Sequence, residues 1–311
     1  MVPFNRYLVL TALCIAPLLS GNVYGQEGTT EGFLSVQGDA KRGDVSSGDT
    51  QSGSTILLLP PGDLYAPYAA DPERLDFGFE LRNYMRTQIP DSGNNRFDLK
   101  AGGEFGLIRI HPHDNSDLGW QLSIEGGFDS QFDIDNHLDN IGWDGKYGLL
   151  LTTATTQNLS FKFGLLHDSS HVGDEYAQRT GRLRIGYTRE EMVAAISWLA
   201  DNGWRTYAEL GRSFFLGNPE LQKPWRGQFG FEWQPAQHTQ GDYRGWYGAG
   251  DFSSMEERDW RIDVSLQTGY RIDSYGKTWR FGIEWYSGRP NIGEFFQESE
   301  TYFALGFWID I

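Results

Sequence analysis

The sequence predicts an all-β fold, an antiparallel transmembrane β-barrel of about 12 strands. Strand-length segments of alternating apolar and polar residues recur along the chain, behind an N-terminal segment with the features of an export signal. Aromatic residues make up 15% of the chain, although hydrophobic residues make up only 39%. A barrel strand places alternate side chains against lipid and against a polar lumen, so this combination is typical of a bacterial outer-membrane barrel.

Residues 1–25 are predicted to be a signal peptide. Arg6 precedes the apolar run Tyr7–Leu19, and small residues follow up to Gly25. This run is too short and too early for a membrane-spanning helix. Cys14, the only cysteine, lies in this segment, so the exported chain has no disulfide or thiol chemistry. We therefore expect export to the bacterial outer membrane.

Two segments precede the predicted barrel. Residues 26–55 are rich in Gly, Ser, Asp and Gln, and we expect a disordered leader because the segment has too little apolar surface to fold. Residues 56–74 form a proline-rich extended segment. Its prolines, at positions 60, 61, 67 and 72, exclude a central strand. We expect this segment to pack at or beneath the mouth of a barrel formed by residues 75–311.

The barrel prediction rests on alternation such as that of Phe77, Phe79 and Leu81 with Glu80 and Arg82. Candidate strands are found at residues 75–82, 97–107, 121–128, 145–153, 159–165, 182–187, 192–199, 205–214, 228–233, 242–252, 260–267, 279–285 and 300–311. Single-chain bacterial barrels close with an even number of strands, so one of these thirteen is wrong. We expect the error among the three weaker segments that follow residue 191.

The two faces of these strands give further expectations. The last strand, residues 300–311, has one apolar face and is the expected contact with the barrel-assembly machinery. Aromatic girdles are predicted from Trp143, Trp204, Trp225, Trp260, Trp279 and Trp308. The alternative for these tryptophans is the core of a soluble β-sandwich.

Charges of both signs are predicted to face the lumen, to pair across strands and to leave the barrel narrow or plugged. They are Glu80, Arg82, Lys100, Glu104, Glu125, Arg182, Arg184, Glu232, Arg261, Asp263, Arg280 and Glu284. The formal charge of −16 becomes −17 when Arg6 is removed with the signal, so we expect no nucleic-acid partner.

Polar residues that could carry chemistry crowd into residues 166–176, LHDSSHVGDEY. Strand parity places His167 and Ser169 on the outward face that Leu165 also occupies, unless a bulge intervenes. A His and a Ser on one strand face can act as base and nucleophile in acyl hydrolysis. One alternative is a loop metal site formed with His171, Asp174 and Glu175. Another is a hydrogen-bonded loop that closes a strand pair.

The His-x-Ser motif resembles that of two barrel-shaped lipid hydrolases, outer-membrane phospholipase A and lipid A 3-O-deacylase. This resemblance implies that His167 is the base and Ser169 the nucleophile. In the phospholipase pattern an Asn follows the serine by roughly a dozen residues, on the adjoining strand, and orients the histidine. Gly181 stands there in this chain, so Asp174 or Glu175 would have to orient His167 from the loop.

Two longer blocks, LPPGDLYAPYAADP (59–72) and HDSSHVGDEY (167–176), resemble the signature blocks of a bacterial family called domain of unknown function 1207. The resemblance spans residues 56–311 and implies an outer-membrane-type barrel with a proline-rich segment, but no activity. It marks a set of residues as important for folding or for chemistry. These are Asp63, Asp71, His167, Ser170, His171, Asp174 and Glu175.

Two functions remain open. The first is a non-enzymatic barrel, structural or passing small solutes. The second is a lipid-modifying serine acyl hydrolase with His167, Ser169 and Asp174 as its site. Outer-membrane lipids are the expected partners in either case, with no cofactor and no metal. The side that the His167 segment faces is ambiguous, since counting strands from Leu75 places it outside and counting back from Ile311 places it in the periplasm.

Overall fold

The computed structural model describes residues 53–233, 244–274 and 277–310. The predicted signal peptide, most of the predicted leader and Ile311 lie outside these residues. Within the described ranges, no helix is long and apolar enough to span a membrane.

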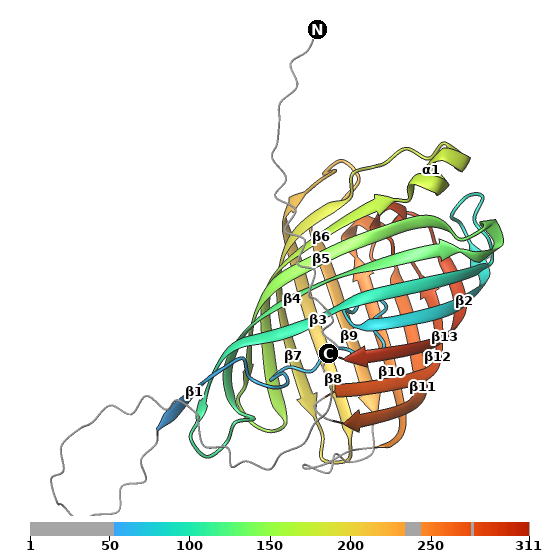
Figure 1. Cartoon of the computed structure of the whole chain (residues 1–311). Helices are drawn as coiled ribbons and strands as arrows, with labels where there is room; N and C mark the ends of the chain where they lie inside the picture. The colour runs from blue at the N-terminus through green and yellow to red at the C-terminus, as the bar shows by residue number, and fades with distance from the viewer. Residues whose placement is uncertain (1–52, 234–243, 275–276, 311) are drawn as a thin grey trace, which may run out of the picture. The chain divides into compact units, whose positions relative to one another are not determined.

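Twelve antiparallel strands close into a barrel, as predicted (Figure 1). They are β2 (Phe77–Thr87), β3 (Asn95–Pro112), β4 (Gly119–Asp133), β5 (Asp139–Ala154), β6 (Leu159–Val172), β7 (Thr188–Leu199), β8 (Trp204–Leu216), β9 (Trp225–Trp233), β10 (Arg244–Met255), β11 (Ile262–Ser274), β12 (Lys277–Gly288) and β13 (Glu300–Asp310). Each pairs with its neighbours in sequence, and pairing of β13 with β2 closes the ring. A further short strand, β1 (Ser54–Leu58), pairs with the end of β3 and stands outside the ring.

The predicted strand at residues 182–187 is wrong. A short helix, α1 (Asp174–Thr180), follows β6, and residues 181–187 then run to β7 without pairing in the sheet. Gly181 and Gly186 adopt positive φ angles of 74° and 73°, which a regular strand does not contain. The segment is held instead by Glu294, whose carboxylate accepts hydrogen bonds from the backbone N–H groups of Ile185 and Gly186.

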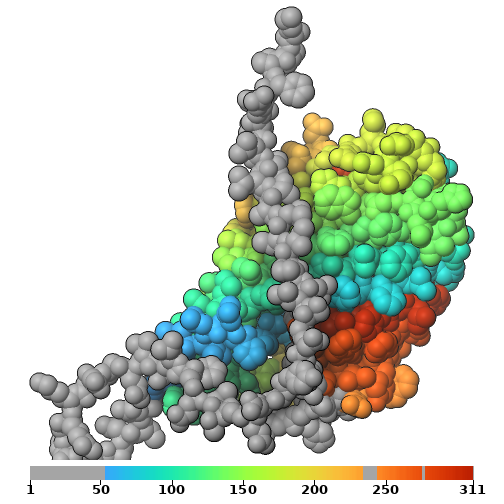
Figure 2. Space-filling view, in the orientation of Figure 1, coloured from blue at the N-terminus to red at the C-terminus, as the bar shows by residue number. Residues whose placement is uncertain are grey.

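The three weaker segments do form strands, since residues 192–199 lie in β7, 205–214 in β8 and 244–252 in β10, while residues 242 and 243 lie outside the described residues. Without a strand at residues 182–187, counting strands from Leu75 and counting back from Ile311 place the His167 segment on the same side of the membrane. β2 begins and β13 ends at one end of the barrel, the terminal end, and α1 lies at the opposite end, the helix end (Figure 1). In the space-filling view, α1 is the yellow-green patch at the helix end (Figure 2).

The two faces of the wall differ as the alternation predicts. Phe79 is 43% exposed on the outward face, whereas Glu80, next to it, is 1% exposed in the lumen. Inside, Arg82 pairs with Glu80 and Asp98, and Arg226 links Glu191 of β7 to Glu209 of β8. The lumen is therefore filled by paired charges together with buried aromatic rings, such as those of Tyr84, Tyr286 and Tyr302.

Four of the predicted face assignments need correction. Arg182 and Arg184 lie in the segment after α1, where they pair with Glu298 and Asp174, and Arg261 lies exposed just before β11. Trp308 faces the lumen and donates a hydrogen bond to a carboxylate there, so it is not a girdle residue. The other five predicted girdle tryptophans are between 37% and 50% exposed.

Residues 61–74, the plug segment, run through the lumen. Tyr68 stacks on Tyr207 of β8 with ring centroids 3.8 Å apart and donates a hydrogen bond to Glu209. Backbone carbonyls of the segment accept hydrogen bonds from inward side chains, for example Ala69 from Arg280 and Pro72 from Lys100. A cavity of about 180 Å³ remains, lined in part by this segment and by β-strand charges.

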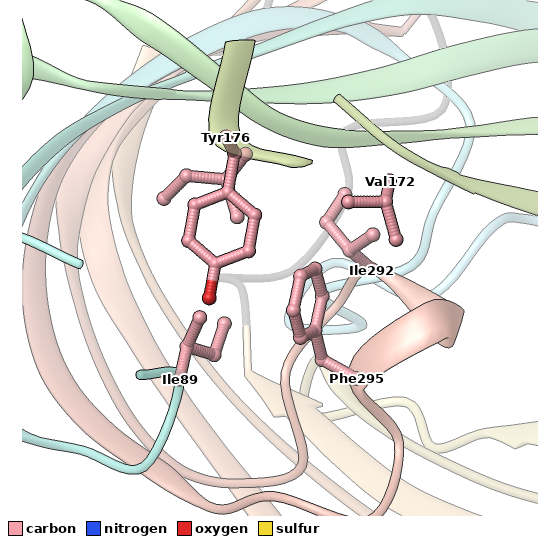
Figure 3. Packing of buried hydrophobic residues seen from close by; sticks show 6 residues of the cluster. Ile89, Val172, Tyr176, Ile292 and Phe295 are labelled. Atoms are coloured by element: carbon pink, nitrogen blue, oxygen red, sulfur yellow. The ribbon is translucent and has the colours of Figure 1, made fainter. Parts of the chain in front are cut away.

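An apolar cluster packs the loops at the helix end against one another (Figure 3). Tyr176 of α1 packs with Ile89 and Phe295, which come from the β2–β3 and β12–β13 connections, and its hydroxyl donates a hydrogen bond to Pro90. Since these residues come from three connections, the cluster fixes α1 and holds the end of β6 in place.

Candidate functional site

The outward face of β5, β6 and β7 near the helix end carries the residues of interest. In the sheet register, Tyr147 of β5 lies opposite His167 of β6, which lies opposite Glu190 of β7. Gly145 and Thr188 lie on either side of Ser169 in the same way. No register shift interrupts these pairings, so the predicted parity holds and His167 and Ser169 continue the outward face of Leu165, which is 52% exposed.

His167 is oriented by an acid from the neighbouring strand. Its Nδ1 lies 2.7 Å from Oε1 of Glu190, with the two side chains 16% and 34% exposed. Because an ionised carboxylate only accepts hydrogen bonds, the neutral imidazole in this contact carries its proton on Nδ1. Nε2 then has a lone pair, and it makes no hydrogen bond with any residue that the structure describes. This is the arrangement of a histidine base with its orienting acid.

Two aromatic rings from β5 hold the histidine rings of β6. Tyr147 stacks on His167 with centroids 4.3 Å apart and ring planes 17° apart. Trp143 stacks on His171 with centroids 4.2 Å apart. Glu190 thus holds one edge of the His167 imidazole, and Tyr147 covers one face of the ring.

Ser169 lies opposite Gly145, in the gap on β5 between the rings of Trp143 and Tyr147. Gly145, its partner on β5, has no side chain, and a Cβ built there would lie 3.3 Å from the Trp143 ring and 3.7 Å from Ser169 Oγ. Ser169 Oγ itself donates only a long hydrogen bond, 3.5 Å, to the Gly145 carbonyl. Among the described residues it makes no hydrogen bond with His167, a looseness that is common in nucleophile–base pairs without substrate.

Asp174 does not join this site. It lies on α1 with its side chain 80% exposed and pairs with Arg184. Glu175 is also exposed on α1. In the part of the chain that the structure describes, no group of three or more His, Cys, Asp or Glu side chains could hold a metal ion, so the arrangement does not favour the loop metal site.

Ser170, also in the signature block, faces inward and has a structural environment. Its hydroxyl donates a hydrogen bond to Asp144 and accepts one from the backbone N–H of Glu294. The backbone N–H of Gly293 donates to the same aspartate. Ser170 thus helps to seat the β12–β13 connection, while Ser169 remains on the outward face.

Glu190 was missed by sequence reasoning. The expected spacing of about twelve residues after Ser169 does not hold, because α1 lengthens this connection. A signal did exist, because Met192, Ile196 and Trp198 mark the outward face of β7 and Glu190 occupies the same parity. A carboxylate on an otherwise apolar face requires a partner, and the partner here is His167.

An apolar groove of about 490 Å³ adjoins the site on the same outward face. Its lining includes Leu149, Leu165 and Met192, each two residues from Tyr147, His167 and Glu190 respectively. The groove therefore begins where the polar site ends.

Comparison with known proteins places this geometry in context. Residues 40–310 match the family described as "Protein of unknown function (DUF1207)". The chain belongs to this family. A search of curated protein sequences finds no match.

Solved structures resemble the chain in fold. Outer membrane phospholipase A from Escherichia coli matches with a TM-score of 0.53 at 12% identity, covering 77% of this chain and 93% of that one. The Salmonella typhi outer membrane phospholipase dimer with bound calcium matches with a TM-score of 0.54 at 12% identity, over 77% and 94% of the two chains. LpxR from Salmonella typhimurium gives a TM-score of 0.40 at 11% identity, over 76% and 99%. The chain thus has the fold of an outer-membrane β-barrel.

Proposed function

We propose that this protein is a lipid acyl-ester hydrolase of the bacterial outer membrane, with Ser169 as nucleophile, His167 as base and Glu190 as the acid that orients it. The observation that carries the proposal is the 2.7 Å contact between His167 Nδ1 and Glu190. It leaves Nε2 available on the strand face that also presents Ser169.

The reaction follows from these positions. Ser169 Oγ attacks the ester carbonyl carbon while His167 Nε2 accepts the hydroxyl proton, and Glu190 stabilises the imidazolium that forms. The ester C–O bond then breaks, and His167 gives the proton to the leaving alkoxide oxygen. A water molecule, deprotonated by the same imidazole, cleaves the acyl-enzyme and releases the fatty acid and the free serine.

The location of the site supports a substrate within the membrane. Ser169 lies near the helix end of β6, on the wall face that bears exposed Leu165 and the apolar groove. Trp143 and Trp225, exposed near the same end of the barrel, are expected at the membrane interface. An acyl chain in the groove would place its ester at the interface, beside Ser169. Outer membrane phospholipase A, a protein of similar fold, is named for action on this class of lipid.

The non-enzymatic alternative is favoured by a different observation, namely the filled lumen. The plug segment and the paired charges would suit a structural barrel, and they do not favour passage of solutes. The two functions differ in what Ser169 contributes, because a structural barrel needs nothing from an outward hydroxyl.

Fatty-acid release by the purified protein tests the proposal. In mixed micelles of phospholipid or lipid A, we expect the wild type to release fatty acid and Ser169→Ala to lose the activity by a factor on the order of 10³ or more. Heat-modifiable migration should be the same for both proteins, which controls for folding. A wild type that releases no fatty acid from either lipid, or an active Ser169→Ala, would show that the proposal is wrong.

A further inference from the structure

We infer that the exposed Arg212 of β8 binds the phosphate of a glycerophospholipid whose acyl chain lies in the groove beside Ser169. This inference rests on the proposed function and names the substrate class. The starting observation is a cation on the outward face. Arg212 is exposed between Leu210 and Phe214, which are 53% and 58% exposed on the same face.

Arg212 has no ion pair among the described residues. Its guanidinium carbon lies 5.4 Å from the ring centroid of Trp225, the residue opposite it on β9. The other strand arginines whose pairs are described face inward and bind carboxylates, as Arg226 does with Glu191 and Glu209. A guanidinium that keeps its hydrogen-bond donors free at a membrane interface is suited to bidentate contact with phosphate oxygens.

Arg212 and Ser169 both lie on the outward face near the helix end of their strands. Ser169 is three residues from the helix end of β6, and Arg212 is four residues from the helix end of β8. In the sheet register Arg212 pairs with Met192 of β7, which pairs with Leu165, so Arg212 is level with a residue four positions from Ser169. At the usual strand dimensions the two Cα atoms are roughly 10 Å apart across the sheet and roughly 13 Å apart along it. The long arginine side chain and the lipid headgroup would together span this separation.

The groove connects the two. Arg212 and Trp225 line it on one side, and Leu149 and Leu165 line it on the side of Tyr147 and His167. Its volume of about 490 Å³ is in the range of ordinary ligand sites, which is about 300–1,000 Å³. One apolar groove, one cation and one nucleophile match a lipid whose ester and single phosphate share a glycerol. Lipid A, with several acyl chains and more than one phosphate, fits this set less well.

A lipid-binding measurement tests this inference separately from ester hydrolysis. In a Ser169→Ala background, we expect Arg212→Gln to weaken binding of fluorescent phosphatidylglycerol in detergent micelles by about tenfold, the scale of one charge-assisted contact. Binding of diacylglycerol with the same chains should not change, because it lacks the phosphate. Arg86→Gln is the matched control, since Arg86 is also exposed near the helix end of its strand but lies on β2, away from the groove.

The same variants are then tested for turnover with Ser169 intact. Arg212→Gln should raise KM for phosphatidylglycerol about tenfold and leave cleavage of an uncharged fatty-acyl ester within twofold. Phosphatidylglycerol binding that is unaffected by Arg212→Gln, an equal loss for diacylglycerol, or a larger loss for lipid A would overturn the inference. Arg212-dependent binding in a protein that cleaves no ester would support the lipid site and reject the hydrolase.

Discussion

At the scale of single residues, the site depends on one cross-strand pair. His167 and Glu190 face each other across β6 and β7 with Nδ1 and Oε1 2.7 Å apart, and Tyr147 covers the imidazole from β5. Strands fix their side chains more firmly than loops, so this pair is pre-oriented before substrate arrives. Ser169 is the adjustable member, since within the described residues its hydroxyl makes only a long hydrogen bond, to the Gly145 carbonyl.

Replacing Glu190 by Gln tests the orienting role. The amide can donate a hydrogen to Nδ1, which favours the tautomer in which Nε2 carries the proton and cannot act as base. We expect kcat for ester cleavage to fall by a factor on the order of 10³–10⁴. Initial-rate measurements would show this fall, with partial recovery in Glu190→Asp.

Asp174→Asn is the control for that experiment. Its side chain is 80% exposed on α1, and we expect kcat within twofold of the wild type. If kcat falls as far in Asp174→Asn as in Glu190→Gln, Asp174 of α1 has the orienting role instead.

The sequence predicts His167 and Ser169 but not Glu190, for a physical reason. Parity along one strand depends only on neighbouring residues, so the outward face of β6 can be read locally. The partner on the next strand depends on register, and register depends on the length and shape of the connection. Here the connection contains α1 and an irregular segment, which no alternation pattern describes.

At the scale of elements, alternation of apolar and polar residues predicts strands well but fails where an irregular connection happens to have the same alternation. Leu183, Ile185 and Tyr187 alternate with Arg182 and Arg184, yet this segment is held by Glu294 and Glu298 from the β12–β13 connection. These contacts come from over a hundred residues away, so they cannot be seen locally. Trp308 shows a second limit of the prediction. Its large aromatic side chain predicted a girdle position, whereas its parity on β13 places it in the lumen.

The outward face of β12 allows a direct test of membrane placement. Ile283 is 54% exposed near the middle of the strand, between Thr268 and Leu305 of the neighbouring strands. Arginine on the lipid face of a barrel costs about 2–4 kcal/mol at the bilayer midplane, so Ile283→Arg should lower the free energy of unfolding in lipid vesicles by about that amount. Denaturant titration followed by tryptophan fluorescence would measure it.

Ile283→Leu is the matched control and should change the free energy of unfolding by less than about 1.5 kcal/mol. If arginine and leucine are tolerated equally at this position, the outward face does not contact lipid.

At the scale of the whole molecule, the interior is built from two sources, the wall and the plug segment. Wall charges pair with one another, and several inward donors also bind backbone carbonyls of the plug segment, as Arg280 does with Ala69. The prolines predicted an extended, plug-like segment at or beneath the barrel mouth, and the segment contacts inward side chains of the wall, such as Glu209 and Arg280. Its partners are single charges spread over many strands.

Tyr68→Ala should loosen the plug segment. The change removes the stacking on Tyr207 and the hydrogen bond to Glu209, and truncation of a buried aromatic residue costs about 3–5 kcal/mol. We expect single-channel conductance in planar bilayers to rise above that of the wild type.

Tyr68→Phe keeps the stacking, loses about 1 kcal/mol with the hydrogen bond, and should conduct like the wild type. Equal conductance in Tyr68→Ala and the wild type would mean that the wall alone blocks the lumen.

The position of the plug segment in the chain has a consequence for biogenesis. The segment directly precedes β2, the strand with which β13 closes the ring, yet it binds Arg205 of β8, Glu232 of β9 and Arg280 of β12. Its binding surface does not exist until those later strands are in place. Filling of the interior and closing of the last free edge are therefore both late events. A copy stalled before them would present an unpaired strand and a hydrated, charged cavity together, which are features by which a cell could tell an unfinished barrel from a finished one.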